Sequence, residues 1–296
     1  MIATGNKNRL ICIYLLIFAS LIAVGCGNAP QEVTPLRLGT TTSVENSGLL
    51  DAILPDFESD YQVRVDVIAV GTGQALALGE RGDVDVLIVH APELEEAFVA
   101  AGHGSARYGM AFNDFVIAGP ADDPAQIADA ASAAGALRRI AEAEALFVSR
   151  GDQSGTHVKE MALWEAAGIS PDETQAWYLS SGQGMGATLT LADELGAYVL
   201  TDRSTVLAFK SELAIATIFG GASTAENPDS AMLNYYSVIP VSSAQNPNVN
   251  EPLAQAFAEW LTSVSTQTQI AQFGIEEYGL PLFFPRSAAW AALQSN

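Results

Sequence analysis

Residues 63–89, VRVDVIAVGTGQALALGERGDVDVLIV, place two apolar runs on either side of a short helical pattern. Residues 63–70 and 84–89 are rich in β-branched side chains and have the length of strands. Residues 74–79 lie between them and have helical spacing. A strand, a helix and a second strand in this order predict the α/β class with mainly parallel sheets.

The same alternation continues on both sides of this stretch. We expect further strands at residues 36–38, 112–118, 146–148, 197–201 and 235–241. We expect helices at residues 47–58, 92–101, 124–145 and 157–167, a helix opening at Ser170, and two helical stretches within 251–272. The sequence contains no long linker, which favours two lobes joined by crossing strands over two separate domains.

The N-terminus has the pattern of an export signal. Lys7 and Arg9 precede a 15-residue apolar run at 10–24, which is shorter than the roughly 20 residues of a transmembrane helix. The run ends in Ile-Ala-Val-Gly-Cys at 22–26, which resembles the bacterial lipobox. We therefore expect a signal peptide at 1–25, lipidation of Cys26 and a tether at 26–35, although an ordinary signal peptide with an incidental cysteine is the alternative. The protein would be exported and anchored to the cell membrane, facing the periplasm or the cell exterior.

Charge and cysteine content exclude several classes of protein. The chain has 13 basic and 34 acidic residues, so it lacks the positive surface that nucleic acid or anionic lipid requires. We expect contact with the membrane only through the N-terminal lipid. The second cysteine, Cys12, lies inside the signal segment, which leaves no pair for a disulfide.

Three loops rich in Ser, Thr and Gly each follow a predicted strand and precede a helix. They are Thr40-Thr41-Thr42-Ser43, Gly71-Thr72-Gly73, and residues 149–156 with the sequence SRGDQSGT. Each loop places backbone N–H groups and hydroxyls at a helix N-terminus, where anions bind. One such loop is explained by helix capping alone, but three loops at the carboxyl ends of strands predict a shared anion site.

Arg150 is the basic residue of these three loops. A guanidinium donates two parallel hydrogen bonds to a tetrahedral oxyanion. Asp152, two residues later, is placed to orient Arg150. The alternative is that Arg150 only pairs with Asp152 or caps a neighbouring helix.

Other kinds of site fit the sequence less well. Gly71-Thr72-Gly73 begins like a dinucleotide fingerprint, but Leu76 stands where the pattern requires Gly or Ala. His90, His103 and His157 lack zinc-ligand spacing, and we interpret them as structural or capping residues. A hydrolase would need Ser154 or Thr156 as nucleophile with His157 as base, yet no third orienting group is evident. We therefore expect no catalytic residues, no metal and no cofactor.

At these residues the chain resembles the tungstate-binding solute-binding proteins of ABC importers. The matching segments are TTTS at 40–43, IAVGTGQAL at 68–76, GDVDVLIVH at 82–90, NDF at 113–115, SRGD at 149–152 and TDR at 201–203. The third loop is also similar to an element of phosphate-binding proteins. One departure from the family pattern is Ala91, where an aspartate is frequent.

The resemblance implies a two-lobed periplasmic-binding-protein-like fold of type II. Lobe 1 would comprise residues 36–113 and 233–296, and lobe 2 residues 114–232. The implied oxyanion contacts are Thr41, Thr42, Ser43 and Thr72 on the first lobe and Arg150, Ser154 and Thr156 on the second. The implied ligand is tungstate, the implied partners are an ABC permease and its ATPase, and we expect a monomer. Molybdate, sulfate and phosphate remain alternative ligands.

Overall fold

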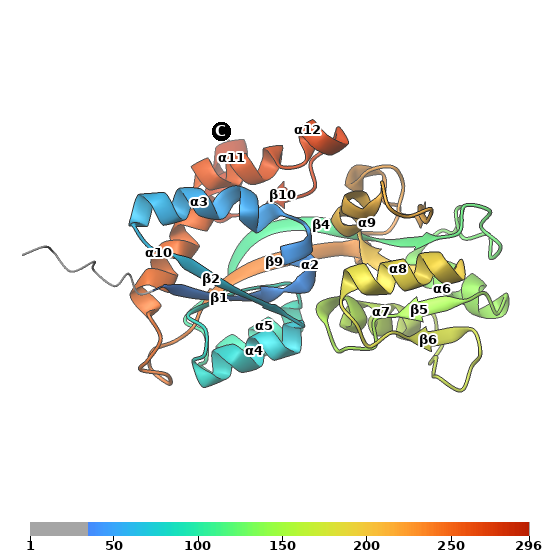
Figure 1. The fold of residues 1–296 in the computed structure, drawn as a ribbon, viewed down its shortest axis with the longest axis horizontal. Helices are drawn as coiled ribbons and strands as arrows, with labels where there is room; N and C mark the ends of the chain where they lie inside the picture. The colour runs from blue at the N-terminus through green and yellow to red at the C-terminus, as the bar shows by residue number, and fades with distance from the viewer. Residues whose placement is uncertain (1–34, 296) are drawn as a thin grey trace, which may run out of the picture. The chain divides into compact units, whose positions relative to one another are not determined.

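The computed structural model describes residues 35–295, and eight strands in this part of the chain share one sheet (Figure 1). Six of them follow the order β10-β4-β9-β3-β1-β2, while β7 and β8 pair with β4. The strands of this sheet are β1 Leu36–Thr41, β2 Val65–Val70, β3 Val86–Val89, β4 Tyr108–Gly119, β7 Val199–Asp202, β8 Ala216–Phe219, β9 Leu233–Pro240 and β10 Phe284–Pro285. A separate pair consists of β5 Phe147–Ser149 and β6 Tyr178–Ser180.

Helices cover both faces of the strands (Figure 1). Their bounds are α2 Thr42–Asn46, α3 Leu49–Tyr61, α4 Thr72–Arg81, α5 Pro92–Ala100, α6 Ala133–Glu142, α7 Gly155–Ala166, α8 Met185–Leu195, α9 Arg203–Phe209, α10 Glu251–Leu261, α11 Val264–Gln272, α12 Ile275–Tyr278 and α13 Ala288–Gln294. Two 3₁₀ turns are η1 Thr224–Glu226 and η2 Ser230–Met232. The expected α/β class is confirmed.

Strand β4 is long enough to belong to two groups of strands. Its first part pairs with β9 as far as Asp114, and its second part pairs with β7 and β8 from Phe115 onward. We call the elements around β1, β2, β3 and β9 the first lobe, and those around β5, β6, β7 and β8 the second lobe. The pairing of β4 changes close to the expected boundary at residue 113. Residues from Pro35 onward form one compact unit, so the lobe boundaries stay a prediction.

The expectation of mainly parallel sheets is correct for β1, β2 and β3 and for the β5–β6 pair. It is wrong for the strands that cross between the lobes, because β9 runs antiparallel to both β3 and β4, and β7 and β8 run antiparallel to β4. The sheets are therefore mixed. A strand that enters the second lobe and another that returns must run in opposite directions.

One predicted helix was wrong in extent, and a second does not form. The helix expected at 124–145 begins only at Ala133, because the Asp123 carboxylate accepts the N–H groups of Ile127 and Ala128 and holds a turn there. Gln126 within that turn has a φ of 53°, which a helix cannot contain. In the described part of the chain no helix begins at Ser170, where the Asp172 carboxylate instead accepts the N–H of Thr174.

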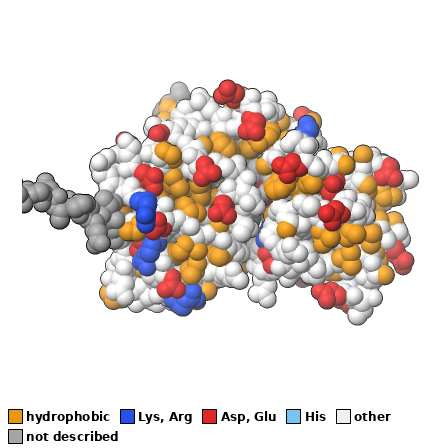
Figure 2. All heavy atoms as spheres, viewed as in Figure 1, with side chains coloured by type: hydrophobic (Ala, Val, Ile, Leu, Met, Phe, Trp, Pro, Cys, Tyr) orange, Lys and Arg blue, Asp and Glu red, His pale blue; other side chains and the backbone are white. Residues whose placement is uncertain are grey.

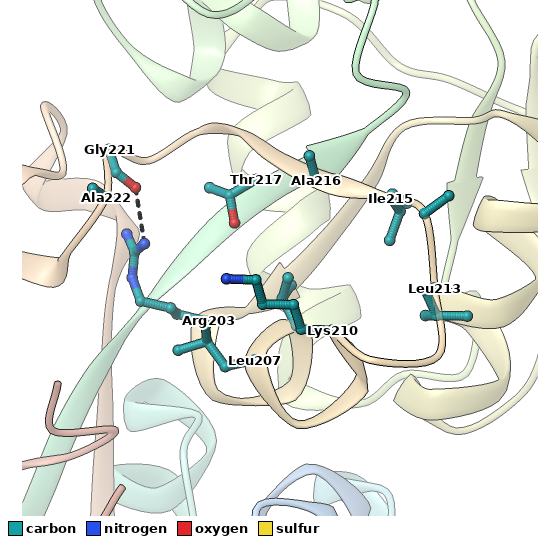
Figure 3. A pocket seen from close by; sticks show the side chains of 11 residues that line it. Arg203, Leu207, Lys210, Leu213, Ile215, Ala216, Thr217, Gly221 and Ala222 are labelled. Atoms are coloured by element: carbon teal, nitrogen blue, oxygen red, sulfur yellow. Dashed lines mark hydrogen bonds between the residues drawn. The ribbon is translucent and has the colours of Figure 1, made fainter. Parts of the chain in front are cut away.

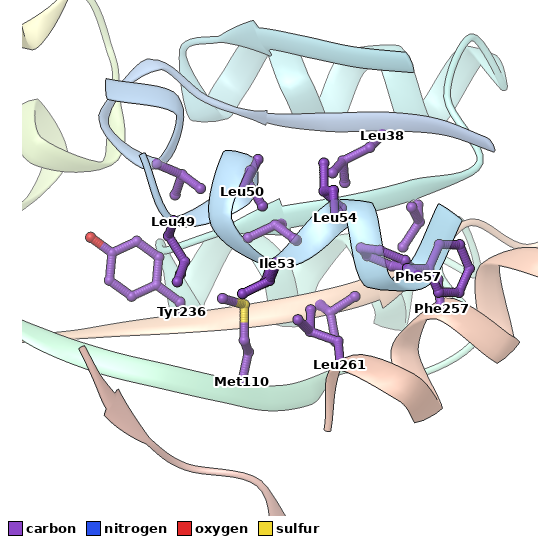
Figure 4. Packing of buried hydrophobic residues seen from close by; sticks show 14 of the residues in the cluster. Leu38, Leu49, Leu50, Ile53, Leu54, Phe57, Met110, Tyr236, Phe257 and Leu261 are labelled. Carbon is purple, nitrogen blue, oxygen red and sulfur yellow. The ribbon is translucent and has the colours of Figure 1, made fainter. Parts of the chain in front are cut away.

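The core of the first lobe forms where α3 and α10 pack on the sheet (Figure 4). Leu50, Ile53, Leu54 and Phe57 recur at helical spacing and are all buried, so one face of α3 is apolar. Phe57 meets Phe257 of α10 edge to face, with ring centroids 4.9 Å apart. This packing fixes the position of α3 and of the loop that precedes it.

Among the described residues, no helix combines the length and apolar character that crossing a bilayer requires. The expected signal peptide, Cys26 and most of the tether lie outside the described residues.

Phe57→Ala should lower the free energy of unfolding by about 3 to 5 kcal/mol, because it removes a fully buried ring from the α3–α10 contact. Leu94→Ala is the matched control, since Leu94 is 38% exposed and should change stability by less than about 1 kcal/mol. Urea denaturation measures both changes. Equal losses in the two variants would contradict the packing described here.

Candidate oxyanion site

All three predicted loops open helices in the structure. Thr41 caps α2, Gly71 precedes α4, and Ser154 caps α7. The helices α4 and α7 begin slightly earlier than their spacing predicts, at Thr72 and Gly155. Thr72 and Thr156 therefore lie in the first turns of their helices, where the backbone N–H groups have no intrahelical partner.

The first loop is largely buried. Thr41 and Ser43 are each 3% exposed, and their hydroxyl oxygens lie 3.0 Å apart. The Oγ1 of Thr41 accepts the N–H of Val44 at 3.4 Å. Thr42 is half-buried, and a Cβ placed at Gly184 before α8 would lie 3.7 Å from its hydroxyl. The glycine-rich segment at 182–186 thus approaches the first loop of the site.

The second and third loops meet directly. The N–H of Gly155 donates to Thr72 Oγ1 at 3.1 Å, across 83 residues of sequence. A Cβ at Gly155 would lie 3.1 Å from the same hydroxyl, so a side chain there would crowd this contact. The contact joins α4 of the first lobe to α7 of the second, as a site between two lobes requires.

Arg150 is buried and held by Asp152. Its side chain is 2% exposed, and Nη2 donates to Asp152 Oδ2. The other carboxylate oxygen of Asp152 accepts the N–H of Ser154 at 3.1 Å. Asp152 therefore contacts both the guanidinium and the cap of α7, and its role in orienting Arg150 toward a ligand stays a prediction.

Two buried polar atoms in the third loop have no hydrogen-bond partner. These are Nε of Arg150 and Oγ1 of Thr156, and Thr156 is 1% exposed. A buried donor without a partner costs about 1 to 3 kcal/mol, and more when it is charged. Such atoms are rare in folded proteins and need an explanation. Both lie in the loop that was predicted to bind an anion.

The hydroxyl oxygens of Thr72 and Ser154 both act as hydrogen-bond acceptors within the protein. Thr72 accepts from Gly155, and Ser154 accepts from the N–H of His157 at 3.3 Å. A hydroxyl carries one hydrogen, and the bonds just named leave that hydrogen free to donate elsewhere. Together with Arg150 and Thr156, the two helix starts can supply hydrogens to an anion.

His90 is a residue of this site whose part the sequence did not indicate. It follows strand β3, is buried, and its Nε2 lies 3.3 Å from Ser43 Oγ. Its Nδ1 lies 2.9 Å from Asn234 Oδ1 on β9. Burial is the main cause that lowers the pKa of His90 to about 4, with a smaller contribution from the positive charge of Arg150, so the ring is neutral near pH 7. In the sequence, only its position at the end of a buried strand could have indicated that His90 belongs to the site.

Glu160 lies behind the third loop. It is 1% exposed, and its carboxylate accepts the Tyr178 hydroxyl at 2.8 Å and Trp164 Nε1 at 3.2 Å. Burial raises the pKa of Glu160 to about 7, although these hydrogen bonds and the N–H of Arg150 lower it. The backbone of Arg150 is therefore tied to the interior of the second lobe.

The arrangement of His157 does not suit the hydrolase alternative. Its Nδ1 accepts the N–H of Gln153 at 3.0 Å, and its own N–H donates to Ser154 Oγ. The contact between these two residues therefore runs through the backbone of His157. A serine nucleophile and its base would instead need a contact through the imidazole.

A cavity of about 630 Å³ lies elsewhere, beside α9 and β8 (Figure 3). None of the seven predicted ligand residues lines it. Its Arg203 donates to Asp114 and to the carbonyls of Gly220 and Gly221. The guanidinium of Arg203 is thus engaged by acceptors within the protein. It has fewer hydrogens free to donate to a ligand than Arg150 has.

Comparison with known proteins agrees with the architecture. Residues 28–265 match the family model described as the PBP superfamily domain. The tungstate-binding protein TupA of Peptoclostridium acidaminophilum is 46% identical over 293 residues, which cover 95% of this chain and 99% of that protein.

Two solved structures are also similar. The tungstate ABC transporter protein of Geobacter sulfurreducens has 46% identity and a TM-score of 0.73, with 81% of this chain and 98% of that chain covered. The tungstate-binding protein TupA of Desulfovibrio alaskensis G20 has 43% identity and a TM-score of 0.70, with 86% and 100% covered.

Glu160→Gln should change how stability depends on pH. Because the folded pKa is raised from 4.5 to about 7, the carboxyl stabilises the fold most below pH 4.5, and this contribution is lost as pH rises through about 7. Between about pH 5 and pH 8, wild type should lose about 2 to 3 kcal/mol relative to the variant. Urea denaturation at both values measures this, with Glu165→Gln on the exposed face of α7 as control. A difference that does not vary with pH would show that Glu160 has no raised pKa.

Proposed function

The chain belongs to the PBP superfamily, and we propose that it captures tungstate outside the cytoplasm and delivers it to an ABC importer. The protein acts as a solute-binding component and not as an enzyme, and it uses no cofactor. Similarity to tungstate-binding proteins over almost the whole chain supports this ligand.

The observation that carries the proposal is the pair of unpartnered donors in the third loop. Arg150 Nε and Thr156 Oγ1 are buried and have hydrogens to give. A bound oxyanion supplies the acceptor that both atoms need. A charge-assisted bond from the guanidinium is about twice as strong as a neutral one, so Arg150 provides the largest single contact.

The state of Asp152 favours tungstate, molybdate or sulfate over phosphate. Phosphate carries a proton near neutral pH and needs an acceptor in its site. Both oxygens of Asp152 are engaged, one by Arg150 and the other by the N–H of Ser154. The loop therefore offers hydrogens, as a fully deprotonated oxyanion requires.

The negative charge of the protein does not oppose this function. Acidic side chains are spread over the face shown in Figure 2, and basic ones gather in few places. The formal net charge of −21 acts at long range, where salt screens it. Binding depends on the nearest charges and dipoles. These are the charge of the Arg150 guanidinium and the dipoles at the N-termini of α4 and α7.

Capture couples the ligand to closure of the lobes. Thr72 belongs to the first lobe and accepts the N–H of Gly155, which precedes Thr156 in the second lobe. An anion held by both loops makes all its contacts only when the lobes are together, so binding favours the closed arrangement. We propose that a monomer in this closed form docks on the permease and its ATPase partner.

Arg150→Ala should weaken tungstate binding by about a hundredfold or more, because the charged donor is lost. Arg150→Lys keeps the charge without the planar fork and should bind with intermediate affinity. Arg64→Ala is the control, since that side chain is 69% exposed and pairs with Asp66. Calorimetric titration with sodium tungstate measures all three variants.

An Arg150→Ala affinity within about threefold of wild type would place the ligand elsewhere. The same titration in the presence of molybdate, sulfate or phosphate ranks the alternative ligands. Displacement of tungstate by equimolar phosphate would contradict the choice of ligand while leaving the oxyanion site intact.

Cys26 is proposed as the lipid anchor, on the sequence pattern alone. In cells that express the full chain, the wild-type protein should sediment with membranes. Cys26→Ala should move it to the soluble extracytoplasmic fraction, because the lipid is lost. Retention of the variant in the membrane fraction would indicate an uncleaved apolar segment instead of a lipid.

A further inference from the structure

Glu160 is a buried carboxyl group that lies directly behind the third loop. It is 1% exposed and belongs to the buried face of α7. Its oxygens accept the Tyr178 hydroxyl at 2.8 Å and Trp164 Nε1 at 3.2 Å. They also accept the Ser149 hydroxyl and the N–H of Arg150. The carboxyl group is therefore bonded to the same loop that carries the guanidinium of the site.

Glu160 has no cationic partner among the described residues. Three other buried acids are each paired with an arginine: Asp85 with Arg37, Glu95 with Arg107 and Asp114 with Arg203. The four groups that donate to Glu160 are all neutral. A buried carboxylate without a paired charge is costly, so Glu160 takes up a proton more readily than the paired acids do.

The charged groups on the elements around Glu160 are engaged elsewhere. These elements are α6, α7, β5, β6 and β7. Their charged or titratable side chains have partners of their own: Arg150 with Asp152, Arg138 with the carbonyl of Ala167, Lys159 with the carbonyl of Ala231, Asp202 with the start of α9, and His157 with the N–H of Gln153. On β6, burial and the charge of Glu160 raise the pKa of Tyr178, so Tyr178 keeps its hydrogen near pH 7. Within this cluster Glu160 is the group whose charge changes near neutral pH.

We propose that Glu160 takes up a proton from solvent when the oxyanion binds, which couples capture of the anion to pH. In the ligand-free protein the carboxyl group is partly ionised near pH 7, because burial raises its pKa to about 7. A dianion on the other side of the loop repels the carboxylate and raises this pKa further. The neutral carboxyl group still accepts the N–H of Arg150 through its carbonyl oxygen, so the loop keeps its position.

The coupling has a definite sign. The bound protein holds more protons than the free protein, so affinity falls as pH rises through about 7. If the dianion raises the pKa of Glu160 by about one unit, roughly 0.4 proton is taken up at pH 7. Affinity then falls about fivefold between pH 6.5 and pH 8. The coupling rests on the proposed function for its ligand, but any doubly charged oxyanion held by the third loop would produce it.

Calorimetric titration of the wild-type protein with sodium tungstate at pH 7 measures the proton uptake. The titration is repeated in buffers of different ionisation enthalpy, and the slope of the binding enthalpy against that quantity gives the number of protons. We expect roughly 0.4 proton for wild type, and the same for Glu165→Gln, which changes an exposed carboxyl group on the same helix. Binding of tungstate with no proton uptake would overturn the coupling and leave the proposed function in place.

Glu160→Gln keeps the shape of the side chain in a permanently neutral form. It should take up no proton and should bind tungstate about fivefold more tightly than wild type at pH 8, because the repelling carboxylate is gone. At pH 6.5, where most of the wild-type carboxyl groups are protonated, the two affinities should agree within about twofold. A purely structural role for Glu160 predicts weaker binding at both pH values instead.

His157→Gln tests the other titratable side chain near the loop, and it should retain the proton uptake. Uptake that persists in Glu160→Gln, or that disappears in His157→Gln, would assign the proton to another group and refute the proposal.

Tyr178→Phe provides a second variant in case Glu160→Gln does not fold. The Tyr178 hydroxyl makes the strongest of the hydrogen bonds that favour the ionised form of Glu160. Its removal raises the pKa of Glu160 in the ligand-free protein, so the loss of tungstate affinity should move to higher pH. A pH profile identical to that of wild type would contradict the role of Glu160.

The ligand and the coupling are tested separately. If wild type does not bind tungstate, the proposed ligand is wrong, and the same calorimetry with molybdate and sulfate measures the uptake for another dianion. Roughly 0.4 proton would then support the coupling without tungstate. Binding of none of these anions would overturn both proposals.

Discussion

The structure of the site depends on one constraint: the guanidinium of Arg150 is almost fully buried, and its Nε–H has no protein acceptor. Burying a charge is costly unless it is paired. Asp152 pairs with one side of Arg150, while Nε and the nearby Thr156 hydroxyl have no protein partner. The pairing of Asp152 with Ser154, the buried Glu160 behind the loop and the contact with Thr72 all hold these donors in place.

Much of this could be predicted because it is local in the sequence. Arg150, Asp152 and Ser154 lie within five positions, and the capping hydroxyls of Thr41 and Ser154 follow from the residues that start helices. The α/β class followed from the alternation of apolar runs. Where prediction was wrong, a side chain competed with the helix, as Asp123 and Asp172 do when they bind nearby backbone N–H groups.

The remaining features involve residues far apart in the chain. Thr72 and Gly155 are 83 positions apart, and His90 and Asn234 are 144 apart. The sequence contains no local signal for such contacts, because the long strand β4 and its return partner β9 create them when the lobes form. The antiparallel direction of these crossing strands was missed for the same reason. The hydrogen bonds of Asn113 on β4, with Ser204 of α9 and with Asn234 of β9, likewise join residues 91 and 121 positions apart.

The central claim is that an oxyanion bridges the two unpartnered donors of the third loop. A crystal of the tungstate complex, measured at the tungsten absorption edge, locates the metal without reference to any assumed pose. The anomalous peak should lie within hydrogen-bonding reach, through one oxygen each, of Arg150 Nε and Thr156 Oγ1. A peak in the cavity beside α9, or one outside the three loops, would contradict the assignment.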